Sequence, residues 1–294
     1  MTRIMDITEQ ITYSTVLIRC YDQNNNRSMG TGFFVDLMPK NDDDHHAPFL
    51  ITNDHVVTNG VRTEIEICKS DKNGDPIDTQ TVTLQFGNHL WFHHPDPLVD
   101  LCCAPVKLII DENHLEENLF YRYLQLEYIA TESILNNLFA IEEVIMVGYP
   151  RGISDEYNHK PIVRRGITAS HPKKDFQGKK ETLLDITVFP GSSGSPVFIC
   201  NHGVYSTMET TYIGCPRVLL LGVVYRLRPD LEQELLRIFK DESHLVVMKN
   251  LREINLNLAF MIKAERILDF VKMFEVGVPI KNPGLPSPKQ EIES

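Results

Sequence analysis

The chain has 294 residues, of which 42% are hydrophobic and 23% charged, a balance typical of a soluble globular protein with a buried core. Its formal net charge of −11 argues against nucleic acid as a partner, because phosphate binding requires a basic surface. The longest apolar run, residues 218–225, is too short to span a bilayer, so no membrane is expected either.

The first half of the chain has the texture of strands joined by turns. Residues 7–19 run from a short helix into a strand, and residues 30–37 form the answering strand after a polar turn. Alternating apolar side chains predict two further half-buried strands at residues 65–68 and 81–86. An Asn-Gly-Asp-Pro turn at residues 73–76 separates them.

Two segments contain neighbouring histidines, residues 41–46 and the pair His93 and His94. Both are interpreted as solvated loops, because side chains in adjacent positions rarely share one metal geometry. No metal site is therefore expected.

Residues 111–140 are rich in Leu, Glu and Tyr and are interpreted as a linker between two halves, with a short helix after Thr131. Strands resume beyond the linker and are predicted at residues 143–147, 162–169, 182–188, 196–200 and 218–226. Lys and Arg concentrate in residues 159–174; this segment is interpreted as a solvated loop, and docking of an acidic partner is the alternative.

Two helical patterns follow the last of these strands. Pro229 opens an amphipathic pattern over residues 229–239, and a second apolar stripe consists of Ile267, Phe270, Val271 and Phe274. Both stripes are expected to pack on the strands. The tail at residues 279–294 has several prolines and no periodicity, so it is predicted to be disordered.

The six cysteines show no Cys-x-x-Cys pair and no regular spacing. Cys102 and Cys103 adjoin inside an apolar run and are interpreted as small core residues. The N-terminus lacks the charged-then-apolar pattern of a signal peptide. These features predict reduced thiols and a cytoplasmic location.

A glycine-rich turn surrounds Ser193, in the form Gly-x-Ser-Gly-x-Pro. Gly191 and Gly194 permit a tight backbone, and the amides of Gly191 and Ser193 would then converge as an oxyanion hole. Ser192 is a weaker rival nucleophile. A plain turn has the same composition, so the motif alone does not establish catalysis.

Two other residues strengthen the catalytic interpretation. His55 follows an apolar run, and Asp100 directly precedes another. The order His55, Asp100, Ser193 supplies a general base, an orienting carboxylate and a nucleophile. This order disfavours an α/β-hydrolase esterase, in which the serine comes first and the histidine last.

The sequence resembles the trypsin-like serine peptidases, and most closely their HtrA/Deg-type branch. The matching blocks are residues 30–35 (GTGFFV), 52–57 (TNDHVV), 100–101 (DL), 147–150 (VGYP), 165–169 (RGITA), the Ser193 loop, and 257–262 (NLAFMI) as the closing segment. The resemblance implies an all-β, chymotrypsin-like double β-barrel with the active site between the barrels. Ser192 and Ser195 depart from the family, which usually has Asp or Asn and Gly there.

On this resemblance, residues 1–278 form a single peptidase domain without a PDZ domain. The N-terminal barrel is expected at residues 8–110, the linker at 111–140 and the C-terminal barrel at 141–226. A helical insertion at 227–253 and a closing segment with its helix at 254–276 complete the domain.

The resemblance also implies a specificity pocket (S1) with Thr187 at its base. Val223, Val224 and Tyr225 would line this pocket and pair with the substrate backbone as an added strand. Because Thr187 is not an acid, a preference for Lys or Arg is disfavoured, and a small or medium uncharged side chain is expected.

The expected activity is serine endopeptidase hydrolysis of a protein or peptide substrate through an acyl-enzyme, without a cofactor. Gating by a regulatory protein partner or by homo-oligomerisation is left open. The alternative is a non-catalytic protein-binding module on a protease fold.

Overall fold

The computed structural model describes residues 5–38, 46–115, 118–227 and 257–275. The predicted helix at residues 229–239, nearly all of the predicted insertion around it and the tail from residue 279 lie outside the described residues. So does most of the 41–46 segment.

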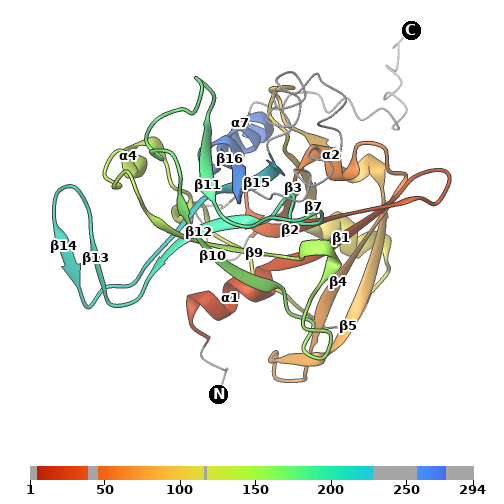
Figure 1. Cartoon of the computed structure of the whole chain (residues 1–294). Helices are drawn as coiled ribbons and strands as arrows, with labels where there is room; N and C mark the ends of the chain where they lie inside the picture. The colour runs from red at the N-terminus through yellow and green to blue at the C-terminus, as the bar shows by residue number, and fades with distance from the viewer. Residues whose placement is uncertain (1–4, 39–45, 116–117, 228–256, 276–294) are drawn as a thin grey trace, which may run out of the picture.

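The N-terminal half forms an eight-stranded antiparallel sheet with the order β5-β4-β1-β2-β3-β7-β6, in which β8 pairs with β4 (Figure 1). A short helix, α1 (Ile7–Ser14), precedes the sheet, and the Asp6 carboxylate caps it by accepting from the amides of Thr8 and Glu9. The strands are β1 (Thr15–Tyr21), β2 (Arg27–Asp36), β3 (Pro48–Thr52), β4 (Arg62–Ser70), β5 (Pro76–Gly87), β6 (Phe92–His93), β7 (Cys102–Pro105) and β8 (Leu119–Phe120).

The C-terminal half forms a closed barrel with the order β10-β11-β16-β15-β12-β9. Its strands are β9 (Glu143–Gly148), β10 (Ile162–Thr168), β11 (Glu181–Asp185), β12 (Pro196–Asn201), β15 (Arg217–Leu227) and β16 (Leu258–Lys263). A hairpin of β13 (Val204–Ser206) and β14 (Thr211–Ile213) extends away from this barrel (Figure 1). The predicted all-β, trypsin-like class is confirmed.

The linker carries little regular structure. After β7 come α3 (Val106–Glu112), β8, the 3-10 turn η2 (Leu126–Tyr128) and α4 (Glu132–Leu135), which is the helix predicted after Thr131. Ile129 bridges to Leu220 of the second barrel. The chain therefore passes from one half to the other between β8 and Ile129.

A single apolar cluster joins the two halves. It contains Phe33 and Ile51 from the first sheet together with Phe198 and Leu220 from the second barrel, and all four side chains are almost completely buried. Burial of this much apolar surface between the halves holds them in one relative orientation. That orientation is what positions the site between them.

The C-terminal helix strengthens this connection. The turn η5 (Ala264–Ile267) and helix α7 (Leu268–Glu275) follow β16 of the second barrel. Ile267 and Phe270 are fully buried, and the ring of Phe274 stacks on Phe49 of β3 with a centroid distance of 5.0 Å. The second predicted apolar stripe thus packs as expected, on the first sheet.

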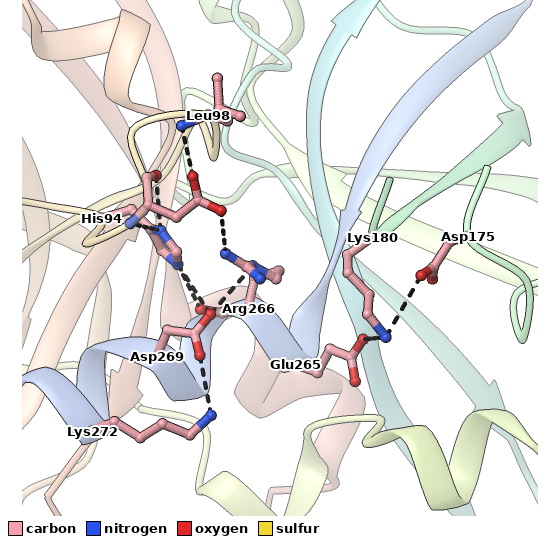
Figure 2. A network of polar contacts seen from close by, with 9 residues as sticks. His94, Leu98, Asp175, Lys180, Glu265, Arg266, Asp269 and Lys272 are labelled. Carbon is pink, nitrogen blue, oxygen red and sulfur yellow. Dashed lines mark hydrogen bonds and ion pairs between the residues drawn. The ribbon is translucent and has the colours of Figure 1, made fainter. Parts of the chain in front are cut away.

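Polar contacts fasten the same helix to the loop between β6 and β7 (Figure 2). His94 Nε2 donates to the carbonyl of Arg266 at 3.1 Å, and Arg266 Nη2 lies 2.9 Å from Asp96 Oδ2. The His94 side chain is only 1% exposed, so the interpretation of His94 as part of a solvated loop is wrong. The helix therefore supports the loop that ends at Asp100.

Candidate active site

The structure brings His55 and Asp100 into direct contact. His55 lies on α2 (Asp54–Val57), which begins one residue beyond the end of β3, and Asp100 is separated from β7 by Leu101 alone. Because β3 and β7 are hydrogen-bonded neighbours that pair Thr52 with Cys102, the end of one strand meets the start of the other. Adjacent strands of one sheet thus deliver both side chains.

The contact between them is bidentate. The His55 ring Nδ1 lies 2.6 Å from Asp100 Oδ2, and the backbone amide of His55 donates to Asp100 Oδ1 at 2.9 Å. A carboxylate at Nδ1 selects the tautomer that carries its proton there, so Nε2 keeps the lone pair of a general base. The His55 side chain is 49% exposed, so part of it faces the surface.

Asn53 stabilises the loop that contains Asp100. Its side-chain amide donates to the Asp100 carbonyl at 2.8 Å, and the residue is fully buried. A buried side chain with a single rotamer is suited to fixing a loop. Sequence reasoning treated Asn53 only as part of a matching block and did not identify this contact.

A second histidine–carboxylate pair lies on the other side of α2. His93 Nδ1 contacts Asp54 Oδ1, and the hydroxyl of Thr58 donates to Asp54 Oδ2 at 2.9 Å. The hydrogen bond to Asp54 raises the pKa of His93. Burial raises the pKa of Asp54, but the hydrogen bonds from His93 and Thr58 outweigh burial and lower it below its ordinary value.

Ser193 lies in the loop between β11 and β12. Gly191 has φ of +92° and Gly194 has φ of +86°, in the left-handed region that favours glycine. A Cβ on Gly194 would lie 1.9 Å from the carbonyl oxygen of Thr31. Both glycines are therefore required by the backbone, as the turn motif predicted.

Thr31 of β2 attaches this loop to the first sheet. Its amide donates to the Ser193 carbonyl at 2.8 Å, and its hydroxyl donates to the Gly191 carbonyl at 2.9 Å while it accepts from the Tyr149 amide at 3.0 Å. The Thr52 hydroxyl in turn donates to the Thr31 carbonyl at 2.7 Å. Since Thr52 ends the strand that leads to His55, two hydrogen bonds connect the serine loop to that strand.

The amides of Gly191 and Ser193 are available to a ligand. In the described part of the chain neither donates a hydrogen bond to the protein. The preceding carbonyl, of Pro190, accepts from the Arg151 amide at 2.6 Å and is thereby occupied. Unused N–H groups on a tight turn beside a serine can bind the oxygen of a polarised carbonyl.

The two candidate nucleophiles have different environments. Ser192 is 1% exposed, and its hydroxyl oxygen lies 3.3 Å from the Phe189 amide, from which it accepts a hydrogen bond. Ser193 is half-buried, and its hydroxyl donates to the Tyr225 carbonyl at 3.3 Å. Among the described residues Ser193 makes no hydrogen bond with the ring of His55. Burial disfavours Ser192 as the nucleophile.

The residues predicted to form the S1 pocket are only partly at the surface. Thr187 is half-buried and its hydroxyl donates to the side-chain oxygen of Asn257 at 3.0 Å. Val223 and Val224 are 0% and 1% exposed and pack in the core, so their side chains offer no surface to a substrate. Tyr225 is half-buried.

Metal chemistry has no candidate site among the described residues. No three His, Cys, Asp or Glu side chains gather there in a way that could hold an ion.

All six cysteines are free thiols, and burial raises the pKa of Cys102 and Cys103 well above the ordinary value. Their burial confirms that these two are core residues. Over the same described ranges, no helix is long and apolar enough to cross a membrane.

Comparison with known proteins gives one family and a set of similar structures. The trypsin-like peptidase domain model matches residues 30–204, and no curated protein matches the chain. The active form of the Rv3671c protease from M. tuberculosis is 14% identical, with a TM-score of 0.43 over 87% of this chain and 78% of that one.

Two further solved structures show a similar level of likeness. The serine endoprotease from Yersinia pestis is 11% identical, with a TM-score of 0.48 over 91% of this chain and 65% of that one. A variant of the HtrA-type protease AlgW with a tripeptide is 12% identical, with a TM-score of 0.46 over 90% and 61%. The chain spans less than two thirds of either structure's length.

Proposed function

This chain belongs to the trypsin-like peptidase domain family, and on that premise we propose that it is a serine endopeptidase. The observation that carries the proposal is the 2.6 Å contact between His55 Nδ1 and Asp100 Oδ2, on a side chain that is 49% exposed. Asp100 orients the ring, His55 is the general base, and Ser193 is the nucleophile.

The reaction is acyl transfer to water. His55 Nε2 takes the proton of the Ser193 hydroxyl as its oxygen attacks the peptide carbonyl, and the amides of Gly191 and Ser193 stabilise the resulting oxyanion. His55 then gives the proton to the leaving amine, which departs and leaves an acyl-enzyme. Water then attacks the ester while His55 takes its proton, and His55 returns that proton to the departing Ser193 oxygen as the acid product is released.

The hydroxyl of Ser193 must turn before it can react. It donates to the Tyr225 carbonyl at 3.3 Å, so this hydrogen bond has to break before the hydroxyl can donate to His55. A bound peptide supplies one reason for the rotation, and a regulatory partner or homo-oligomerisation supplies another. Because this contact occupies the Ser193 hydroxyl, it also fits the alternative function, a non-catalytic protein-binding module.

The strand β15 suggests how a peptide lies in the site. The first β12 residue, Pro196, pairs with Val223, so β15 continues beyond its β12 partner at residues 225–227. A peptide added to this edge would bring its carbonyl to Ser193. Thr187 at the base of the S1 pocket accommodates a small or medium uncharged side chain.

Domain organisation and location are part of the same proposal. Residues 1–278 form one peptidase domain that acts in the cytoplasm on a protein or peptide substrate. The free state of all six cysteines supports a reducing compartment.

Labelling with a fluorophosphonate probe tests the proposal directly, because the probe reacts only with an activated serine. We expect labelling of the wild type and of Ser192→Ala, and none of Ser193→Ala or His55→Ala. Ser193→Ala and His55→Ala should both retain the wild-type circular dichroism spectrum, which shows that they are folded. Equal labelling of Ser193→Ala would refute the assignment, and no labelling of any folded protein, with or without peptide, would favour the binding module.

A further inference from the structure

Two arginines share one aromatic ring, that of Phe189, in the segment that leads into the serine loop. The guanidinium carbons of Arg151 and Arg164 lie 5.0 Å and 5.2 Å from the ring centroid of Phe189. Arg151 comes from the 3-10 turn η3 (Pro150–Gly152), whereas Arg164 comes from β10. Stacking on a ring limits the rotamers of each guanidinium and fixes where its charge lies.

These two positive charges have no partner among the residues that the structure describes. Among the described residues neither guanidinium forms an ion pair or donates a hydrogen bond, although each carries several N–H donors. The neighbouring Arg165, on the other face of β10, pairs with Glu143. Arg164 is half-buried and Arg151 is exposed, so a guanidinium in either position can take an anionic partner from outside the protein.

The arginines adjoin the catalytic loop. The Arg151 amide donates to the Pro190 carbonyl at 2.6 Å, and a Cβ on Gly191 would lie 3.0 Å from the Arg151 nitrogen. Arg151 itself has φ of +54°, a left-handed conformation that costs energy in a non-glycine residue. Phe189, on which both guanidinium groups stack, is two residues before Gly191, so the pair is attached to the segment that leads into the serine loop.

We propose that Arg151 and Arg164 form a subsite for a carboxylate side chain of the peptide substrate, so that the enzyme selects peptides with Glu or Asp near the scissile bond. The proposal deepens the peptidase function and rests on it. Guanidinium groups bind carboxylates with charge-assisted, geometrically specific hydrogen bonds. In a chain of net charge −11, two cations that have no partner among the described residues also attract an acidic peptide against the general repulsion.

This subsite is separate from the predicted S1 base. Thr187 is uncharged and is engaged with Asn257, so it makes no demand for an acid. The carboxylate is expected to occupy one position of the peptide, since a single ring holds both arginines. The basic segment at residues 159–174 therefore contains one residue of this subsite, Arg164. Its neighbours Arg165 and Lys160 instead form ion pairs within the protein.

Cleavage of a peptide set in which Glu and its isostere Gln are scanned through the positions flanking the scissile bond tests the proposal. One position should show a preference for Glu of about tenfold or more in kcat/KM, the size expected for a charged hydrogen bond. Arg164→Gln and Arg151→Gln should each reduce that preference most of the way to unity. Arg165→Gln is the matched control, and its preference should equal that of the wild type.

Binding provides a readout that does not depend on turnover. With the Ser193→Ala protein, fluorescence anisotropy of the labelled Glu and Gln peptides should show the same preference, and the preference should weaken as salt is raised. Loss of the preference in Arg164→Gln but not in Arg165→Gln supports the subsite. Equal affinity for both peptides overturns it, whereas failure of the peptidase assignment is seen separately in the fluorophosphonate labelling of the wild type.

Discussion

The two halves of the molecule hold their parts of the candidate site by different means. The first sheet presents His55 and Asp100 through side-chain hydrogen bonds between the ends of neighbouring strands. The second barrel presents Gly191 and Ser193 through backbone conformation, with left-handed glycines and carbonyls bound by Thr31. The positions of His55 and Asp100 thus depend on side-chain hydrogen bonds, whereas the candidate oxyanion loop depends on the conformation of the main chain.

Substitutions in the two halves should therefore have different effects on activity and stability. Changing His55 or Asp100 should alter chemistry with little effect on folding, because both of these candidate side chains are partly exposed. Changing the support of the loop should affect stability and chemistry together, because its contacts with Thr31 are buried. Substitutions in each half can test whether this difference exists.

The largest effect is expected at Asp100. Asp100→Asn keeps the shape of the side chain but can donate to Nδ1, which favours the wrong tautomer of His55. We expect kcat to fall roughly ten-thousand-fold, with the midpoint of urea unfolding nearly unchanged. Steady-state kinetics and denaturation measure both. A kcat within tenfold of the wild type would remove Asp100 from the mechanism.

The support of the oxyanion loop is tested next by Thr31→Val. The Val side chain leaves the Tyr149 amide and the Gly191 carbonyl without their buried hydroxyl partner, which should lower the free energy of unfolding by about 1–3 kcal/mol and also reduce kcat. Thr182→Val is the matched control, because the Thr182 hydroxyl is equally buried and has no partner among the described residues. Similar losses in the two variants would contradict this role of Thr31.

A smaller, pH-dependent effect is expected from the pair of Asp54 and His93. The pKa of His93 is raised in the folded state, so its contribution is complete below the ordinary histidine value of about 6.5 and is lost as pH rises through the folded pKa. The pKa of Asp54 is lowered, so its contribution is present above about 3.9 and is lost as pH falls. His93→Gln should therefore destabilise the protein most between about pH 4 and 6.5.

The size of this effect is limited by solvent. The His93 side chain is 55% exposed, so the loss should stay within about 1 kcal/mol. Thermal unfolding of the wild type and of His93→Gln from acidic to alkaline pH measures it. A difference that grows above pH 8 would show that the pair is not an ion pair.

The smallest effect, and the only stabilising one, is expected at Ser195. Its hydroxyl is completely buried and has no hydrogen-bond partner among the described residues, close to Gly148. Ser195→Ala removes that unsatisfied group and should raise the free energy of unfolding by up to about 1 kcal/mol. Urea denaturation would show the gain, and a clear loss of stability would mean that the hydroxyl has a partner.

Much of the architecture follows from local sequence. The alternation at residues 65–68 and 81–86 predicted strands that the structure contains as parts of β4 and β5. The helical stripe of Ile267 and Phe270 predicted burial that is complete. Such patterns are readable because strands and helices repeat their buried positions at fixed periods.

The sequence by itself also determined which residues are the candidates for catalysis, because His55, Asp100 and Ser193 each stand beside a recognisable strand or turn. Only the tertiary structure decided their surroundings. His94, which looked like part of a solvated loop, is buried against Arg266, a residue far along the chain. The side chains of Val223 and Val224 face the core instead of a pocket.

The stacking of Arg151 and Arg164 on Phe189 was likewise invisible in the sequence, since the three residues come from separate segments. The physical reason is common to all these cases. Periodicity and turn chemistry act between near neighbours in the chain, whereas hydrogen-bond partners and burial depend on segments that only the folded chain brings together.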